Sequence, residues 1–185
     1  AMASLSLVVP PERFGWRDAG KLVVFRTRAA FDVAASKPGA GQIWSPEECT
    51  AHEPALGAAQ HLLAGGIYNP GEAVADCHAF CVALAERLGE HPRFRGVVNS
   101  TALGLRAERG RITGIDTVGG LLTADAYVLA AGIQSRSLAD TVGIYLPLYP
   151  LKGYSLSAPI RQDDIAPEIS VTDFERKVLY ARIGD

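Results

Sequence analysis

The chain has 185 residues, of which 48% are hydrophobic and 21% are charged, and its formal net charge is −2. These values are ordinary for a soluble globular protein, and the small net charge gives no reason to expect a nucleic acid as a partner. No apolar run approaches the roughly 20 residues of a membrane-spanning helix, and only three cysteines are present, so we expect a cytoplasmic protein without a disulfide framework.

The first part of the chain predicts short elements separated by Pro and Gly. Residues 5–20 are rich in Pro, Gly and charge and are typical of irregular structure. Leu22–Thr27 is expected to be a strand and Arg28–Ser36 a short helix. Ser45 followed by Pro46 indicates a second helix, because Ser is a favoured N-cap, Pro suits the first helical position and two acids follow.

Residues 52–88 predict the end of that helix, another strand and the clearest helix of the chain. The helix at Pro46 should end near His52, because Pro54 disfavours helix in the residue before it. A strand over 61–68 would be closed by the turn that follows it. Asp76–Leu88 is expected to be a helix with one apolar stripe. The stripe consists of Cys77, Phe80, Cys81, Leu84, Ala85 and Leu88.

Residues 93–135 predict two β-hairpins that lead into a buried strand, because short alternating runs are separated by Gly-containing turns. The run Tyr127–Gly132 is apolar, short and closed by Gly, which favours a strand buried on both faces. Small residues at the carboxyl end of such a strand allow close approach of a ligand, and α/β sheets bind cofactors there. The expected strands are 93–98, 103–105, 111–115 and 121–124.

The last part of the chain predicts a short helix over about 135–142 and then extended segments. The first extended segment, 146–158, is interrupted by prolines, which suits an edge strand better than a central one. Two further strands are expected at 169–172 and 177–183. A change in composition near Leu146 suggests three domains, 1–71, 72–142 and 143–185, in which the middle block differs from its flanks.

Two glycine motifs are weak matches to phosphate-binding sequences. Gly15–Leu22 has the spacing of a phosphate loop, but Leu22 replaces the Ser or Thr that would hold magnesium. Residues 39–44 begin like a dinucleotide fingerprint, but Trp44 replaces the third glycine and a helix precedes the motif. We interpret both motifs as turns or linkers.

The cysteines and histidines predict neither a metal site nor a catalytic group. Cys77, His78 and Cys81 lie one turn apart on the predicted helix, but a structural zinc site needs four ligands and no second pair follows. The two thiols are therefore interpreted as small core hydrophobes. None of the four histidines pairs with a recognisable nucleophile signature.

Seven segments, from about Gly20 onward, form a more specific pattern than any single motif. They are Leu22–Thr27, His52–Leu56, Gly65–Ile67 with Pro70-Gly71, Asp76-Cys77, Gly110–Gly114, Ala124–Val128 and Tyr149–Ser155. In order and spacing they resemble the small subunit of bacterial D-amino-acid dehydrogenase. That family belongs to the amine-oxidising, FAD-dependent superfamily that includes glycine, sarcosine and D-amino-acid oxidases.

The resemblance implies a fold of mixed α+β and α/β character. It comprises part of an FAD-binding, Rossmann-like layer with a β-meander, and part of an antiparallel-sheet substrate domain. The family's glycine fingerprint for the FAD pyrophosphate and its last glycine-rich segment are not found in this sequence. We therefore expect an internal fragment that binds FAD poorly and is inactive by itself.

The resemblance also implies roles for particular residues. The strand that enters the meander carries, in the family, a valine whose backbone contacts adenine, and this position is Ser100 here. A second departure from the family covers Glu72–Ala75, where an acid, a Thr and a Gly are typical. The residues expected to contact FAD are Ser100, Ala130, Ala131 and Gly132, and those expected on the substrate side are Tyr154 and Arg182.

The function implied for the full-length protein is oxidative deamination of D-amino acids to keto acids and ammonia, by hydride transfer to the flavin, in amino-acid catabolism. The cofactor carries this chemistry, so no catalytic side chain is required. The alternatives are a glycine- or sarcosine-oxidase-like amine oxidase and a non-catalytic module that associates through open sheet edges. Expected partners are the D-amino acid, a quinone acceptor at the inner membrane, to which the full-length protein would bind peripherally, and a second copy of the fragment.

Overall fold

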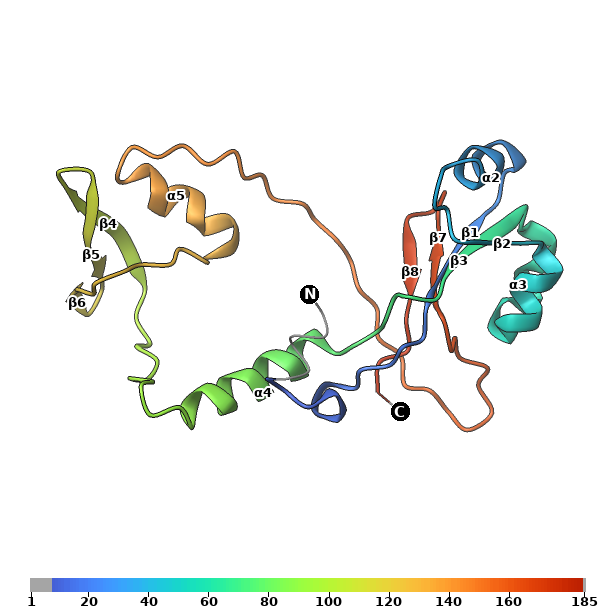
Figure 1. The fold of residues 1–185 in the computed structure, drawn as a ribbon, viewed down its shortest axis with the longest axis horizontal. Coiled ribbons are helices and arrows are strands. Elements are labelled where there is room, and N and C mark those ends of the chain that lie inside the picture. Colours follow the sequence, from blue (N-terminus) through green and yellow to red (C-terminus); the bar gives the residue numbers. More distant parts are fainter. Residues whose placement is uncertain (1–7, 185) are drawn as a thin grey trace. The chain divides into compact units, whose positions relative to one another are not determined.

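A computed structural model describes residues 8–184 and divides them into two compact units, residues 8–94 with 158–184 and residues 95–157. The first unit contains a five-stranded sheet and the second a three-stranded meander beside a helix (Figure 1). The expected fold class is confirmed. The predicted domain boundaries at 71 and 142 concern the complete protein and stay a prediction, and residues 1–7 and 185 of those domains lie outside the described residues.

The sheet of the first unit is mixed, with the strand order β2-β3-β1-β7-β8. Strands β1 and β7 are parallel, and the other neighbours are antiparallel. The strands expected near the two ends of the chain are present. The strand expected over 61–68 begins later, because a 3₁₀ segment (η2) extends to Leu62. The strands are β1 (Lys21–Phe25), β2 (Gln42–Trp44), β3 (Gly65–Asn69), β7 (Ser170–Asp173) and β8 (Val178–Tyr180), and η2 is Pro54–Leu62.

Helix α3 (Pro46–His52) packs on one face of this sheet (Figure 1). Its predicted start is confirmed: Ser45 Oγ accepts a hydrogen bond from Glu48 N, and the Glu48 carboxylate accepts one from Ser45 N, which is a capping box. A core cluster forms beneath it around Leu22. A Cβ at Gly66 would lie 2.6 Å from Cys49 Sγ, so only glycine allows this close packing.

The other face of the sheet is covered at one end by α2 (Arg28–Ala35). Phe31 of this helix packs with Phe25 and Ile67. Thr27 caps the helix as its hydroxyl oxygen accepts a hydrogen bond from Ala30 N. The helix expected from Arg28 is therefore confirmed.

Cys49 is expected to resist alkylation in the folded chain, whereas Cys77 and Cys81 react. Burial raises the pKa of the Cys49 thiol to about 11, with Glu48 and Glu47 adding to the effect, so almost no thiolate is present at pH 8. The other two cysteines are exposed. Intact mass after iodoacetamide treatment should show two additions on the folded chain and three after unfolding. A third addition at the same rate without denaturant would contradict this.

Helix α4 (Cys77–Gly89) packs on η1 (Pro11–Phe14), and both belong to the first unit. The helix is confirmed, with Asp76 as its N-cap. The apolar stripe predicted for it is wrong at four of its six positions, because Cys77, Cys81, Ala85 and Leu88 are exposed. The positions that contact η1 and its neighbours are Ala79, Phe80, Ala83 and Leu84.

Two carboxylates, that of Asp173 at the end of β7 and that of Glu175 in the turn after it, hold the segment that joins β1 to α2. Asp173 pairs with Arg26 at 2.6 Å and accepts a hydrogen bond from Arg176 N. Glu175 accepts hydrogen bonds from the N–H groups of Arg26 and Thr27 and from the Thr27 hydroxyl. Burial would raise the pKa of both carboxyls, but these hydrogen bonds outweigh it and hold both below their ordinary values.

Acid is therefore expected to destabilise the first unit. A carboxyl whose pKa is lowered by folding stabilises the folded state fully at pH values above its unfolded pKa, which is near 4. This stabilisation is lost as the pH falls from there through the lower pKa of the folded state. The midpoint temperature of thermal unfolding should fall between pH 7 and pH 3, and it should fall less steeply with pH in Asp173→Asn than in the parent chain. Asp32→Asn, which removes an exposed pair with Arg28, should keep the slope of the parent chain. Equal slopes for all three proteins would contradict the assignment.

The second unit is an antiparallel meander, β4-β5-β6, with helix α5 beside it (Figure 1). The meander and the helix are confirmed near their expected positions. The hydroxyl of Thr141, just after α5, accepts a hydrogen bond from Leu105 N at 2.9 Å and so ties the helix to β4. The elements are β4 (Ala102–Glu108), β5 (Arg111–Thr117), β6 (Gly120–Leu122), a 3₁₀ turn η3 (Gly132–Gln134) and α5 (Ser135–Asp140).

Three expected strands are not formed. Residues 93–98 and 146–158 contain no strand, and the run Tyr127–Gly132, expected to be buried on both faces, is not one either. Val128 in this run is 92% exposed. A strand forms only by pairing with a neighbouring strand, and the described residues supply no such neighbour for this run. No helix within residues 8–184 combines the length and apolarity that crossing a membrane requires.

Candidate functional site

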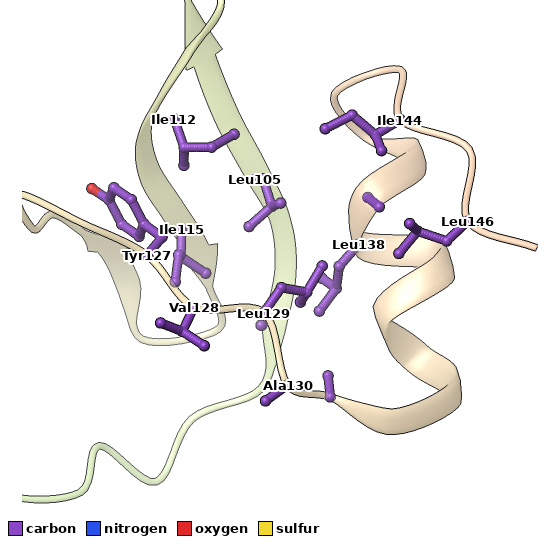
Figure 2. Close-up of a pocket in the computed structure, with 13 residues that line it drawn as sticks. Leu105, Ile112, Ile115, Tyr127, Val128, Leu129, Ala130, Leu138, Ile144 and Leu146 are labelled. Atoms are coloured by element: carbon purple, nitrogen blue, oxygen red, sulfur yellow. The ribbon is translucent and has the colours of Figure 1, made fainter. Parts of the chain in front are cut away.

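An apolar groove of about 650 Å³ lies in the second unit, between the meander, the run Tyr127–Ala131 and α5 (Figure 2). Its volume is within the range of about 300–1,000 Å³ typical of small-molecule sites. Its principal aliphatic side chains come from both sides of the groove, as Figure 2 shows. They are Leu105 from β4, Ile112 and Ile115 from β5, Leu138 from α5, and Ile144 and Leu146 from the segment after α5.

The meander determines which side chains face this groove. Leu105 and Ile115 are directly paired between β4 and β5, so both project from the same face of the sheet. Ile112 joins that face after a change of register between Arg106 and Ala107. Such a bulge turns the strand locally and allows positions that are an odd number of residues apart to share a face.

Ala130 and Ala131 line one end of the groove, and Gly132 follows them to complete the Ala130-Ala131-Gly132 tip. Ala131 N donates a hydrogen bond to Ser135 Oγ at 3.0 Å, and Gln134 N donates to Ala131 O, so the backbone turns sharply into α5. Gly132 has φ +56°, a conformation that favours glycine, and no atom lies within 4 Å of where its Cβ would be. The three tip residues are exposed. The tip is thus bare of covering side chains, as a cofactor-binding role requires.

The groove fits one part of a dinucleotide better than another. No charged side chain lines it, and its one polar side chain is that of Tyr127, whose hydroxyl already accepts a hydrogen bond from Ala124 N. Such walls suit a flat aromatic ring rather than a pyrophosphate, which needs N–H donors or cations. Within residues 8–184 no cluster of His, Cys, Asp and Glu could hold a metal ion.

Ser100 lies just before β4, at the entry to the meander, and is not among the residues that line the groove. Its Oγ accepts a hydrogen bond from Gly119 N at 3.2 Å, and its N–H donates to Val98 O. The Ser side chain therefore has a structural use in joining the entry of β4 to the β5–β6 turn. Its predicted backbone contact with adenine stays a prediction.

The two residues predicted on the substrate side belong to different units. Tyr154 lies in the second unit and is 93% exposed. Arg182 lies in the first unit, where its guanidinium pairs with Glu168 at 2.7 Å and its carbonyl oxygen accepts a hydrogen bond from Arg17 Nη2. Both substrate roles stay predictions.

The aliphatic wall of the groove was not expected from the sequence. Strand alternation alone would place Ile112 and Ile115, which are three residues apart, on opposite faces, and only the bulge brings them to the same one. No local pattern links Leu138, Ile144 and Leu146 to that face, because their neighbours in space lie some thirty residues away. Ser135, which holds the tip through Ala131, was also missed.

Comparison with known proteins relates the chain to one family. A family model described as FAD dependent oxidoreductase matches residues 9–184. D-amino acid dehydrogenase 2 of Pseudomonas aeruginosa is 46% identical over 175 residues, which cover 93% of this chain and 41% of that protein. The protein of the same name in Ralstonia nicotianae is 42% identical over 194 residues, which cover 99% of this chain and 46% of that protein. The chain thus spans less than half the length of the curated relatives it matches.

Two solved structures also match this chain. Glycine oxidase from Geobacillus kaustophilus matches with a TM-score of 0.64 and 25% identity, covering 80% of this chain and 42% of that one. L-proline dehydrogenase from P. horikoshii matches with a TM-score of 0.63 and 17% identity, covering 93% and 48%. The second similarity concerns the fold alone.

Proposed function

Because this chain belongs to the family of FAD-dependent oxidoreductases, we propose that the protein carrying it oxidises D-amino acids to keto acids and ammonia. The resemblance found in the sequence is confirmed. The substrate class is proposed because relatives matching over 93% and 99% of the chain are named D-amino acid dehydrogenases. Since the chain spans only part of these relatives, the activity is proposed for a protein in which their remaining segments are also present.

The observation that carries this proposal is the bare tip at the end of an apolar groove. Ala130, Ala131 and Gly132 present main chain without covering side chains, and the aliphatic wall beside them suits a planar ring. We propose that these three residues contact FAD, and that the backbone at Ser100 contacts its adenine. When bound, FAD supplies the redox chemistry, as acceptor of a hydride from Cα of the amino acid.

In this scheme the chain's own residues would bind and orient the substrate. Tyr154 and Arg182 are proposed to face the substrate, Arg182 through a guanidinium held by Glu168. Two hydrogen-bonded arginine positions, Arg17 and Arg182, surround one Glu168 carboxylate, which leaves an excess of positive charge. An excess cation suits the carboxylate of an amino acid.

A chimera tests the proposal. The matched segment of the Pseudomonas aeruginosa relative would be replaced by this chain, and the purified protein assayed for bound flavin and for reduction of a quinone analogue with D-alanine. We expect stoichiometric FAD and turnover. A folded chimera that retains FAD but oxidises no D-amino acid would reject the substrate class, and one without FAD would reject the cofactor site.

A second substrate class is favoured by the similarity to glycine oxidase. The same chimera, assayed with glycine, sarcosine and D-alanine, separates the two classes by kcat/KM. Hydrogen peroxide formation identifies oxygen as the electron acceptor, whereas dependence on the quinone analogue supports the proposed quinone. Co-sedimentation of the full-length protein with membranes tests the proposed peripheral location, and its absence would favour the cytoplasm.

A non-catalytic role is the third candidate, favoured by the open edge of the first sheet. Strand β8 is an edge strand, and its three residues, Val178, Leu179 and Tyr180, are all exposed. Unpaired edges invite pairing with a second copy. Light scattering of the 185-residue chain should then show a dimer, whereas a strict monomer at high concentration counts against it. We also expect this chain alone to purify without stoichiometric flavin.

A further inference from the structure

The guanidinium of Arg136, on α5, lies over two tyrosine rings of the segment that follows the helix. Its Cζ is 5.6 Å from the ring centroid of Tyr145 and 5.7 Å from that of Tyr149. The two phenol oxygens are 3.3 Å apart and share one hydrogen bond. These contacts, all within the second unit, favour this position of the Arg136 side chain.

The Arg136 guanidinium has no hydrogen-bond or carboxylate partner among residues 8–184, although the residue is half-buried. Seven of the fourteen arginines differ in this respect. Those paired with a carboxylate are Arg13, Arg17, Arg26, Arg28, Arg87, Arg106 and Arg182. Among the described arginines that lack such a pair, only Arg136 is held over aromatic rings. Within residues 8–184 its guanidinium N–H donors therefore lie beside the two rings without an acceptor.

This arrangement has a definite chemical consequence. Aromatic rings contact the face of a guanidinium, whereas its five N–H donors point outward in its plane, where they match the two oxygens of a carboxylate or phosphate. In the Tyr145–Tyr149 pair one hydroxyl donates to the other, and the accepting hydroxyl keeps its own O–H free to donate. The cluster thus offers in-plane N–H groups and one O–H.

Asp140 is the nearby group that opposes such a site. It lies four residues after Arg136 on α5, yet it forms no ion pair with it in the described part of the chain. Its charge is felt at Tyr145, whose pKa is raised by the hydrogen bond with Tyr149, by burial and by Asp140. Removing the Asp140 charge should therefore strengthen the binding of an anion.

We propose that Arg136, Tyr145 and Tyr149 form a binding site for an oxyanion, either a phosphate group of a dinucleotide or the carboxylate of an amino acid. Arg136 follows Gly132 of the tip by four residues, and Ile144, which lines the groove, precedes Tyr145. The groove itself has no charged lining, so a charged ligand that enters it needs a partner outside that lining. The site rests on these side chains alone, and it can fail while the proposed activity holds.

Titration of the 185-residue chain with inorganic pyrophosphate or with D-alanine, at constant ionic strength, tests the site. The Arg Nε–Hε resonance of Arg136 and the ring resonances of Tyr145 and Tyr149 should shift and saturate with at least one of the two probes. Saturation by pyrophosphate alone identifies the phosphate source, and saturation by D-alanine alone identifies the carboxylate. No saturation with either probe up to about 20 mM, well above a millimolar Kd, would overturn the proposal.

Variants separate this site from general charge. Arg136→Gln should weaken binding of the anion at least about tenfold, because hydrogen bonds to a charged group are lost. The affinity of Arg136→Lys should lie between those of the parent chain and Arg136→Gln. Asp140→Asn should tighten binding. Arg111→Gln, an exposed arginine of β5 with no carboxylate partner in the described chain, removes the same charge and should leave the affinity unchanged. Equal losses in Arg111→Gln and Arg136→Gln would show non-specific attraction and reject the site.

Discussion

Replacing Glu53 by alanine is expected to lower the free energy of unfolding of the first unit by about 3–5 kcal/mol. The Glu53 side chain is fully buried, and its carboxylate accepts three backbone hydrogen bonds. Oε1 accepts from Ala55 N at 3.2 Å, and Oε2 accepts from the N–H groups of Glu168 and Ile169 at 2.8 and 2.7 Å. The carboxylate thereby joins the end of α3 to the start of β7, more than a hundred residues later. Alanine would remove all three bonds and leave buried N–H groups without acceptors.

Urea unfolding of the 185-residue chain measures the effect. The free energy of unfolding should fall less in Glu53→Gln than in Glu53→Ala, because the amide oxygen of Gln can still accept a hydrogen bond from the backbone N–H groups on one side of the former carboxylate. Glu47→Ala, on the exposed side of the same helix, should leave the midpoint unchanged. A loss below about 1 kcal/mol in Glu53→Ala would mean that water replaces the carboxylate, and the proposed link between α3 and β7 would then be wrong.

Glu53 also shows where prediction from the sequence ends. The segment His52–Leu56 was recognised as part of the family resemblance, but its physical role depends on Glu168 and Ile169, which no local pattern connects to it. By contrast, the start of α3 depends on neighbours in the sequence, so Ser45 could be predicted as its N-cap from the sequence alone, and the structure adds the reciprocal bond from Glu48. Strand β2 could not be predicted for the same reason as the role of Glu53. Its three residues become a strand only through pairing with β3, which lies elsewhere in the sequence.

The run Tyr127–Ala131 illustrates the same limit in the second unit. Its apolar composition predicted a strand buried on both faces, yet a strand is defined by its neighbours, and the described residues provide none for it. The prediction of a bare tip at Ala131 depended only on small residues next to a glycine, and the described geometry agrees with it. The contacts of Arg136 with two tyrosines could not be predicted, because spacings of nine and thirteen residues across a turn follow no regular period.

Phenylalanine in place of Ala131 is expected to remove FAD from the chimera, with a fall in affinity of about 100-fold, or ~3 kcal/mol. Ala131 is exposed, and its N–H bond to Ser135 does not involve its side chain, so the larger residue should leave the unfolding midpoint of the 185-residue chain unchanged. The added ring would instead occupy the space in front of the tip, where a cofactor ring is proposed to lie. Gly132 is less suitable for this test, because its positive φ adds backbone strain to any substitution.

The flavin absorbance of the purified chimera, relative to its protein absorbance, measures this effect. Ala107→Phe is the matched control, because Ala107 is an exposed alanine of β4 that does not line the groove, and it should retain full FAD. Because Ala131→Phe changes neither charge nor backbone donors, a selective loss of flavin can only reflect the volume placed at the tip. If Ala131→Phe binds FAD as tightly as Ala107→Phe, the tip does not contact the cofactor, and the groove is more simply explained as a surface that another part of the protein covers.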